Sequence, residues 1–158
     1  MLKKVINKIL KDFKNFKLIF RPHPKEQQEL IDIIREKYKN NKRISIDLNP
    51  IYLNSFIQSN FAIADYTGSA YSYALLTSKP VIFYFNKKLD KDQKDTNFYK
   101  DLSNIGTIAE NINDIKKKYY QIKKNEKKIK RKIKMFKQRI FPENNKFINN
   151  FSNFLENY

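Results

Sequence analysis

Short apolar runs alternate with segments of helical periodicity over the first 110 residues, and this alternation limits the possible folds more than any other feature of the chain. Strands that alternate with helices form βαβ units, in which a parallel sheet is covered on both faces. We therefore expect an α/β fold with a doubly wound, Rossmann-like parallel sheet. The expected strands are residues 17–20, 43–47, 61–64 and 80–85, with Gly106–Ala109 as a final edge strand.

Apolar residues at helical spacing predict helices in the segments between these strands. The expected helices are residues 2–15, a helix from near Pro24 to Tyr38, a short helix opened by Pro50, and Ser69–Leu76. Residues 86–104 are polar and charged, and we interpret them as a surface loop. After residue 110 we expect a long basic helix or a pair of helices. A last helix through Phe147 and Leu155 would then fold back on the sheet.

The length and composition of the chain exclude several classes of protein. A chain of 158 residues can bury one sizeable core, so we expect a single domain over residues 1–158. Residues 1–110 would form the parallel core and residues 111–158 the helices that pack back on it. With no cysteine and one histidine, we expect no disulfide, no metal and no cofactor. No apolar run approaches the roughly 18 residues of a membrane span, which predicts a cytoplasmic protein.

The formal charge of the chain is +17, and most of it lies toward the C-terminal end. Thirteen Lys or Arg and a single acid, Glu126, lie between Lys116 and Arg139. Such a segment suits an anionic polymer or the anionic inner face of a membrane. Asn and Lys are abundant, as is typical of proteins from AT-rich genomes, so codon bias is the alternative explanation of the excess lysine.

The segment Asp65–Ala70, with the sequence Asp-Tyr-Thr-Gly-Ser-Ala, follows an expected strand and precedes an expected helix. The first N–H groups of a helix are unpaired and lie at the positive end of its dipole, where they can bind a phosphate. Gly68, one of only two glycines in the chain, and its small neighbours would let a ligand reach the backbone. The alternative is an ordinary helix cap and turn that binds nothing.

The segment Arg21-Pro22-His23-Pro24 follows an earlier expected strand, and its two prolines stiffen the loop. Ligands of open parallel sheets bind beyond the carboxyl ends of the strands, so this loop and the glycine turn should face one cleft. A diphosphate held at the glycine turn could then be reached by Arg21 and His23. The alternatives are a histidine that bonds only to backbone and an arginine that is a plain surface charge.

Taken together, these segments resemble the C-terminal, donor-nucleotide-binding half of the CDP-glycerol glycerophosphotransferases and of related teichoic-acid and capsule polysaccharide glycosyltransferases with the GT-B fold. The resemblance covers nearly the whole chain but only one half of such an enzyme. The segments that carry it, in matching order and spacing, are Arg21–Pro24, Ala64–Ala70, Lys79–Tyr84 and Arg139–Phe141.

The resemblance implies that Arg21 and His23 lie at the diphosphate of the donor, with His23 as the catalytic residue. Negative charge grows on the leaving phosphate during transfer, and an imidazolium, a guanidinium and backbone amides would stabilise it. The positions that the resemblance implies for donor and phosphate binding are Arg21, His23, Asp65, Thr67, Gly68, Ser69 and Ala70.

The chain departs from the family's pattern in two respects. Ser72 and Tyr73 stand where many glycerophosphotransferases carry a second acid, which leaves the donor open between CDP-glycerol and a related nucleotide sugar. The N-terminal half with the acceptor site and the family's catalytic base is absent, which predicts a truncated or split enzyme that works with a separate acceptor domain.

Three functions remain open at this point. The leading hypothesis is a donor-binding transferase domain that acts on an anionic polymer acceptor and contacts the inner membrane surface through Lys116 to Arg139. A nucleic-acid-binding protein is the second, suggested by the charge and by Tyr119 and Tyr120, although no recognised nucleic-acid motif is present. The third is an inactive fragment that retains the fold.

Overall fold

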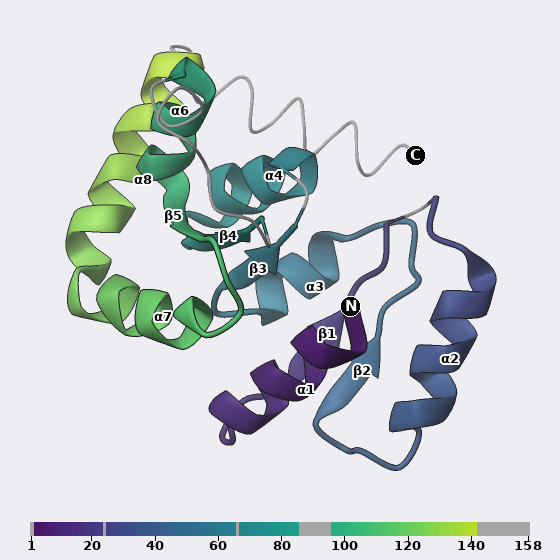
Figure 1. The fold of residues 1–158 in the computed structure, drawn as a ribbon. Coiled ribbons are helices and arrows are strands. Elements are labelled where there is room, and N and C mark those ends of the chain that lie inside the picture. Colours follow the sequence, from purple (N-terminus) through teal and green to yellow (C-terminus); the bar gives the residue numbers. More distant parts are fainter. Residues whose placement is uncertain (1, 24, 66, 86–95, 142–158) are drawn as a thin grey trace. The chain divides into compact units, whose positions relative to one another are not determined.

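Parallel strands and the helices between them form two units, residues 1–60 and residues 61–158 (Figure 1). The computed structural model describes residues 2–23, 25–65, 67–85 and 96–141. Open sheets of parallel strands confirm the expected Rossmann-like α/β class. The single domain and its division near residue 110 stay predictions. In the described part of the chain, no helix is long and apolar enough to cross a bilayer.

Unit 1 contains a two-stranded parallel sheet, with Leu18 opposite Ile44 and Phe20 opposite Ile46. These four side chains pack against a buried cluster from two helices, which consists of Ile6, Leu10, Ile34 and Tyr38. Because alternate strand residues point to one face, α1 and α2 cover the same face of this sheet. The elements of unit 1 are α1 (Leu2–Asp12), β1 (Leu18–Phe20), α2 (Gln28–Tyr38), β2 (Ile44–Ile46) and α3 (Leu53–Gln58).

The strands and helices of unit 1 lie within a few residues of their expected positions. The helix expected from near Pro24 begins at Gln28, and Pro24 lies outside the described residues. The short helix expected at Pro50 begins at Leu53, with Phe56 as its buried residue. Local apolar spacing was therefore sufficient to find these elements, but not their first residues.

Arg43 joins the start of β2 to the end of α1. Its guanidinium donates hydrogen bonds to the carbonyl oxygens of Leu10 at 2.6 Å, Phe13 at 3.3 Å and Lys14 at 2.6 Å. The last carbonyl groups of a helix have no partner inside the helix, so a cation that reaches several of them also complements the dipole. Arg43 is thus a C-terminal cap for α1, supplied from about thirty residues further along the chain.

Unit 2 contains a three-stranded parallel sheet in the order β3-β4-β5. The central strand is buried at all four positions, from Val81 to Tyr84, so both of its faces are covered. Helices α4 and α7 both pack against it. The elements of unit 2 are β3 (Ala62–Ala64), α4 (Thr67–Thr77), β4 (Val81–Tyr84), α6 (Asn97–Ile105), β5 (Gly106–Ala109), α7 (Asp114–Lys124) and α8 (Glu126–Ile140).

The basic segment after residue 110 forms a pair of helices, α7 and α8, and not one long helix. A pair was one of the two expected arrangements. Ile115 and Ile122 of α7 are buried, and so are Ile133 and Phe136 of α8, at 0 to 4 % exposure. The apolar sides of both helices are therefore used by the core of unit 2. The last expected helix, through Phe147 and Leu155, lies outside the described residues.

The interpretation of residues 86–104 as a surface loop is wrong for the described part of that segment, residues 96–104. Helix α6 begins at Asn97, and the Thr96 hydroxyl caps it by accepting a hydrogen bond from the Tyr99 N–H at 3.2 Å. Leu102 and Ile105 are fully buried. Their spacing of three is a helical signal that the surrounding lysines and aspartates obscured.

No side chain fits at Gly106, where β5 pairs with β4. A Cβ at this position would lie 2.0 Å from the carbonyl oxygen of Val81, which is backbone and has no room to move aside. We predict that Gly106→Ala lowers the free energy of unfolding by about 3 kcal/mol, because the strand pair must shift to accept the methyl group. Urea unfolding measures the effect.

Ser103→Ala is the control for this prediction, because Ser103 is exposed on the neighbouring helix α6. It should change the free energy of unfolding by about 0.5 kcal/mol or less. A Gly106→Ala protein as stable as the parent would contradict the close approach of β5 to Val81.

Arg43→Ala should lower the free energy of unfolding by about 2 kcal/mol, because three carbonyl groups lose a charged donor. Hydrogen exchange should show faster exchange of the α1 amides. Lys42→Ala, at the exposed neighbouring position, is the control and should leave both quantities unchanged. Equal effects of the two substitutions would rule out the capping role of Arg43.

Candidate functional site

The candidate site begins at the carboxyl end of β1, where Arg21 and His23 follow the strand. Because β2 runs parallel to β1, the loop that follows β2 emerges at the same edge of this sheet. Asp47 and Asn49 lie in that second loop. The edge therefore gathers a cation, an imidazole, a carboxylate and an amide within unit 1.

Arg21 ties these two loops together. Its Nη1 donates to the Asp47 carboxylate at 2.7 Å, and its Nη2 donates to the carbonyl oxygens of Asn49 at 2.5 Å and Pro50 at 3.4 Å. The guanidinium also lies over the Tyr52 ring, 5.6 Å from its centroid. The Arg21 side chain therefore orders the loop between β2 and α3.

The His23 ring is exposed and is oriented by the loop that carries it. Its Nδ1 accepts a hydrogen bond from the Lys25 N–H at 3.1 Å, and its carbonyl oxygen accepts one from the Glu26 N–H at 2.8 Å. When Nδ1 accepts this hydrogen bond, Nε2 is the N–H group of the ring. Nε2 is thus the ring nitrogen that would donate to an anion, and the imidazolium role expected from the sequence stays a prediction.

The glycine turn follows β3 in unit 2. Asp65 is exposed, Tyr66 lies outside the described residues, and α4 begins at Thr67. Gly68 and Ser69 occupy the first turn of the helix and are exposed, whereas Ala70 is only 2 % exposed. The helix thus presents small residues at its N-terminus, and Ala70 can offer a ligand its backbone N–H but not its side chain.

The expected site residues are divided between the two units. The structure brings Arg21 and His23 into one loop of unit 1, and Asp65 together with the first turn of α4 into one turn of unit 2. Each segment follows the carboxyl end of a parallel strand, as expected. The convergence of the two segments on one cleft stays a prediction.

The residues that sequence reasoning missed are polar groups in the loop after β2 and in α3. They line a hollow of about 230 Å³ together with Ile19, Ser45, Ile46 and Ile51. The missed signal was the polar pair Asp47 and Asn49 just after a strand, the same rule that identified Arg21 and Asp65. The polar residues of this group are Asp47, Asn49, Asn54, Ser55 and Gln58.

Asp47 is the centre of this polar group. Its carboxylate accepts hydrogen bonds from the Ser55 hydroxyl, from the Asn49 N–H at 2.9 Å and from Arg21. Burial acts to raise the pKa of Asp47, but the hydrogen bonds from Ser55 and Asn49 and the charge of Arg21 outweigh it and lower the pKa below its usual value. Asp47 is therefore held as a carboxylate.

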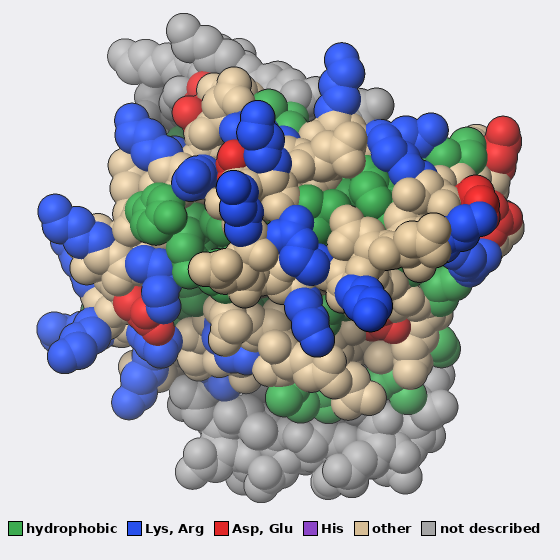
Figure 2. All heavy atoms as spheres, turned by 90° about the horizontal axis from the view of Figure 1, so that it is seen from below, with side chains coloured by type: hydrophobic (Ala, Val, Ile, Leu, Met, Phe, Trp, Pro, Cys, Tyr) green, Lys and Arg blue, Asp and Glu red, His purple; other side chains and the backbone are tan. Residues whose placement is uncertain are grey.

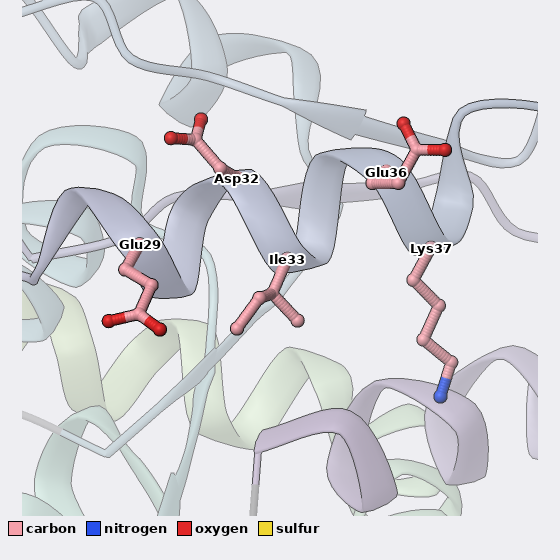
Figure 3. Close-up of a pocket in the computed structure, with 5 residues that line it drawn as sticks. All are labelled: Glu29, Asp32, Ile33, Glu36 and Lys37. Carbon is pink, nitrogen blue, oxygen red and sulfur yellow. The ribbon is translucent and has the colours of Figure 1, made fainter.

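A larger hollow of about 680 Å³ lies along the outer surface of α2 (Figure 3). All of its lining residues come from this one helix, and Glu29, Asp32 and Glu36 among them are acidic. Three carboxylates with one nearby lysine would repel a diphosphate. This surface is therefore no candidate for the donor site.

Within the described residues, no group of three or more His, Cys, Asp or Glu side chains is arranged to hold a metal ion. The two loops and the helix N-terminus carry N–H donors and the imidazole of His23, beside the carboxylates of Asp47 and Asp65. N–H donors and an imidazole can bind anions through hydrogen bonds.

Asp47→Asn should lower the free energy of unfolding by about 1 kcal/mol at neutral pH, because Arg21 loses its charged partner. The folded-state pKa of Asp47 is lowered, so its stabilising contribution is present above about pH 4, the unfolded value, and is lost as the pH falls through the folded value. The parent should therefore lose its advantage over the variant below about pH 4. Urea unfolding at pH 7 and pH 3 measures both effects.

Asp32→Asn is the control, because Asp32 forms an exposed pair with Arg35 on the surface of α2. It should have little effect at either pH. A stability difference between parent and Asp47→Asn that did not change with pH would contradict the ionised state of Asp47.

Comparison with known proteins identifies the family. Residues 3–148 match the family described as CDP-glycerol:poly(glycerophosphate) glycerophosphotransferase. The minor teichoic acid biosynthesis protein GgaB of Bacillus subtilis (strain 168) is 33 % identical over 97 residues, which cover 61 % of this chain and 10 % of that protein. The chain thus corresponds to about a tenth of the length of this relative. No solved structure gives a significant match. Since the family match spans nearly all of the chain, the chain belongs to the CDP-glycerol:poly(glycerophosphate) glycerophosphotransferase family.

Proposed function

We propose that this chain is the donor-nucleotide-binding domain of a transferase that builds an anionic glycerophosphate-type polymer, with CDP-glycerol or a related nucleotide-activated compound as donor. The observation that carries the proposal is the N-terminus of α4, where Gly68 and Ser69 are exposed a few residues after the end of the parallel strand β3. Backbone N–H groups at such a turn suit the oxygens of a diphosphate. The family match and the likeness to a teichoic acid biosynthesis protein support the class of donor.

His23 is the second part of the proposed donor site. With Nδ1 accepting from the Lys25 N–H, Nε2 would donate a hydrogen bond to the leaving phosphate. A donor oriented before the reaction stabilises the charge that grows there without reorganisation during the transfer. His23 is thus proposed as the catalytic residue that this chain contributes.

Arg21 acts in this proposal through the loop as well as through its charge. Its bonds to Asp47 and to the carbonyl groups of Asn49 and Pro50 hold both loops at the edge of the unit 1 sheet. The positive charge is shared with Asp47, so Arg21 contributes less charge to a ligand than an unpaired guanidinium would. We therefore assign Arg21 mainly to the orientation of the loop in which His23 lies.

Acceptor activation belongs to a part of the enzyme outside these 158 residues in our proposal. The resemblance puts the family's catalytic base in an acceptor-binding half, and the matched region is about a tenth of the length of GgaB. We therefore propose that this chain binds the donor without the help of that half, but requires it for turnover. Donor binding, and not transfer, is the activity to measure first.

His23→Ala and Gly68→Val should each weaken binding of CDP-glycerol by about tenfold to a hundredfold. The first loses a charge-assisted hydrogen bond, and the second adds a branched side chain over the phosphate-binding turn. Calorimetry and thermal shift with CDP-glycerol, CDP-ribitol, UDP-sugars and CMP-sialic acid measure affinity and donor preference.

Lys25→Ala and Asn113→Val are the matched controls. Lys25 lies in the His23 loop and keeps its N–H in the variant, and Asn113 is the N-cap of α7, where it makes no side-chain capping bond. Both variants should bind like the parent. Saturable nucleotide binding that persists in both His23→Ala and Gly68→Val would refute the proposed site.

A further inference from the structure

The outer surface of α7 and α8 is strongly basic, and the donor site makes no use of it. Figure 2 shows Lys and Arg side chains projecting on the left, over the part of unit 2 that carries these helices. Among the described residues of the two helices the acids are Asp114 and Glu126. We use the name basic surface for Lys116, Lys117, Lys118, Lys123, Lys124, Lys127, Lys128, Lys130, Arg131, Lys132, Lys134, Lys137 and Arg139.

Few of these cations are neutralised by the protein. Glu126 pairs with Lys123 and Lys130, each at 2.9 Å, and Arg139 pairs with Asp101 of α6 at 2.6 Å. Hydrogen bonds from the two lysines lower the pKa of Glu126 to about 2, so this carboxylate stays charged at any physiological pH. For the other ten cations, the described structure contains no ion pair.

Three cations of the basic surface form a row along one side of α8. Lys127, Arg131 and Lys134 follow one another at intervals of four and three along α8, and all three are exposed. Such residues lie on one side of a helix, with a rise of about 6 Å and then about 4.5 Å between them. Like charges at this spacing repel each other, and a chain of phosphates would relieve that repulsion.

The apolar sides of α7 and α8 decide between the possible anionic partners. Ile115, Ile122, Ile133 and Phe136 are buried within unit 2, so the helices have no continuous apolar face to insert between lipids. The exposed aromatic residue of the two helices among those described is Tyr120, which is no platform for stacking successive bases. These helices therefore offer neither insertion into a bilayer nor base stacking, whereas a flexible polyanion needs only the cations that they carry.

We propose that the basic surface binds the anionic polymer acceptor, a chain of phosphodiester-linked units, with the row Lys127, Arg131 and Lys134 as its centre. This inference rests on the proposed function, because it assumes that the chain serves a transferase with such an acceptor. Binding is electrostatic, by release of counterions from the polymer, and the polymer is held on unit 2 through residues that take no part in donor binding.

The combined substitution Lys127→Gln, Arg131→Gln and Lys134→Gln should weaken binding of fluorescently labelled poly(glycerophosphate) by about thirtyfold in low salt. The slope of log affinity against log salt should fall by about 2, since each neutralised phosphate contributes about 0.7 for a single chain. Fluorescence anisotropy over a salt series measures both quantities in the full 158-residue protein.

Two further variants separate a specific surface from the net charge of the protein. Lys3→Gln, Lys4→Gln and Lys14→Gln remove the same charge from exposed positions of unit 1 and should leave affinity and salt slope unchanged. Glu126→Gln releases Lys123 and Lys130 and should tighten binding about threefold. Because Glu126→Gln is expected to bind more tightly, partial misfolding of the variant could not produce the expected result.

The opposite results would overturn the inference. Equal losses in the two triple variants, or tighter binding of anionic vesicles or of a DNA oligonucleotide than of poly(glycerophosphate), would exclude the acceptor role. The thermal shift with CDP-glycerol should be identical in parent and triple variants. If CDP-glycerol binds but the polymer does not, this inference alone fails; if the parent does not bind CDP-glycerol, the proposed function fails.

Discussion

Parallel strand pairing is the constraint on which the candidate chemistry depends. Because β1 and β2 run in the same direction, the loops that follow them emerge at one edge, and the Arg21–Asp47 pair at 2.7 Å is the physical result. In unit 2 the same rule puts the turn between β3 and α4 at the carboxyl edge of its own sheet. A helix usually connects one parallel strand to the next, so the carboxyl edge of each sheet combines polar loops with helix N-termini.

The polar edge of unit 1 is organised by hydrogen bonds to charged groups. Asp47 receives bonds from Arg21, Ser55 and the Asn49 N–H, and these outweigh the effect of burial on its pKa. This network has a structural task, the ordering of the loop between β2 and α3. His23 is oriented separately, through its own loop, which directs the Nε2 proton away from the backbone that holds Nδ1. A donor that is oriented before the reaction is well suited to a phosphate.

The two sides of α7 and α8 have different surroundings. Their apolar residues complete the core of unit 2, and their lysines and arginines form a surface with few internal partners. The description of the family includes a poly(glycerophosphate), and this agrees with the polymer that we propose as the ligand of this surface. Codon bias can raise the number of lysines, but it does not explain why the one acid within this tract is paired with two of them while the row on α8 stays unpaired in the described structure.

The sequence by itself determined the parallel α/β class, the approximate place of each strand, the helical nature of the basic segment and the family resemblance, because apolar periodicity and short motifs are local properties. Residues Gly106–Ala109, for example, form β5 with the bounds expected. Only the tertiary structure decided what depends on distant partners: Asp47 opposite Arg21, the capping of α1 by Arg43, and the carbonyl of Val81 that leaves no room for a side chain at Gly106. Helix α6 was missed because the burial of Leu102 and Ile105 depends on the packing of α6 against β5 and α8. The charged residues around these two positions made the segment look like a surface loop. The tautomer of His23 likewise follows from a backbone donor two residues away, whose direction is set by the folded loop.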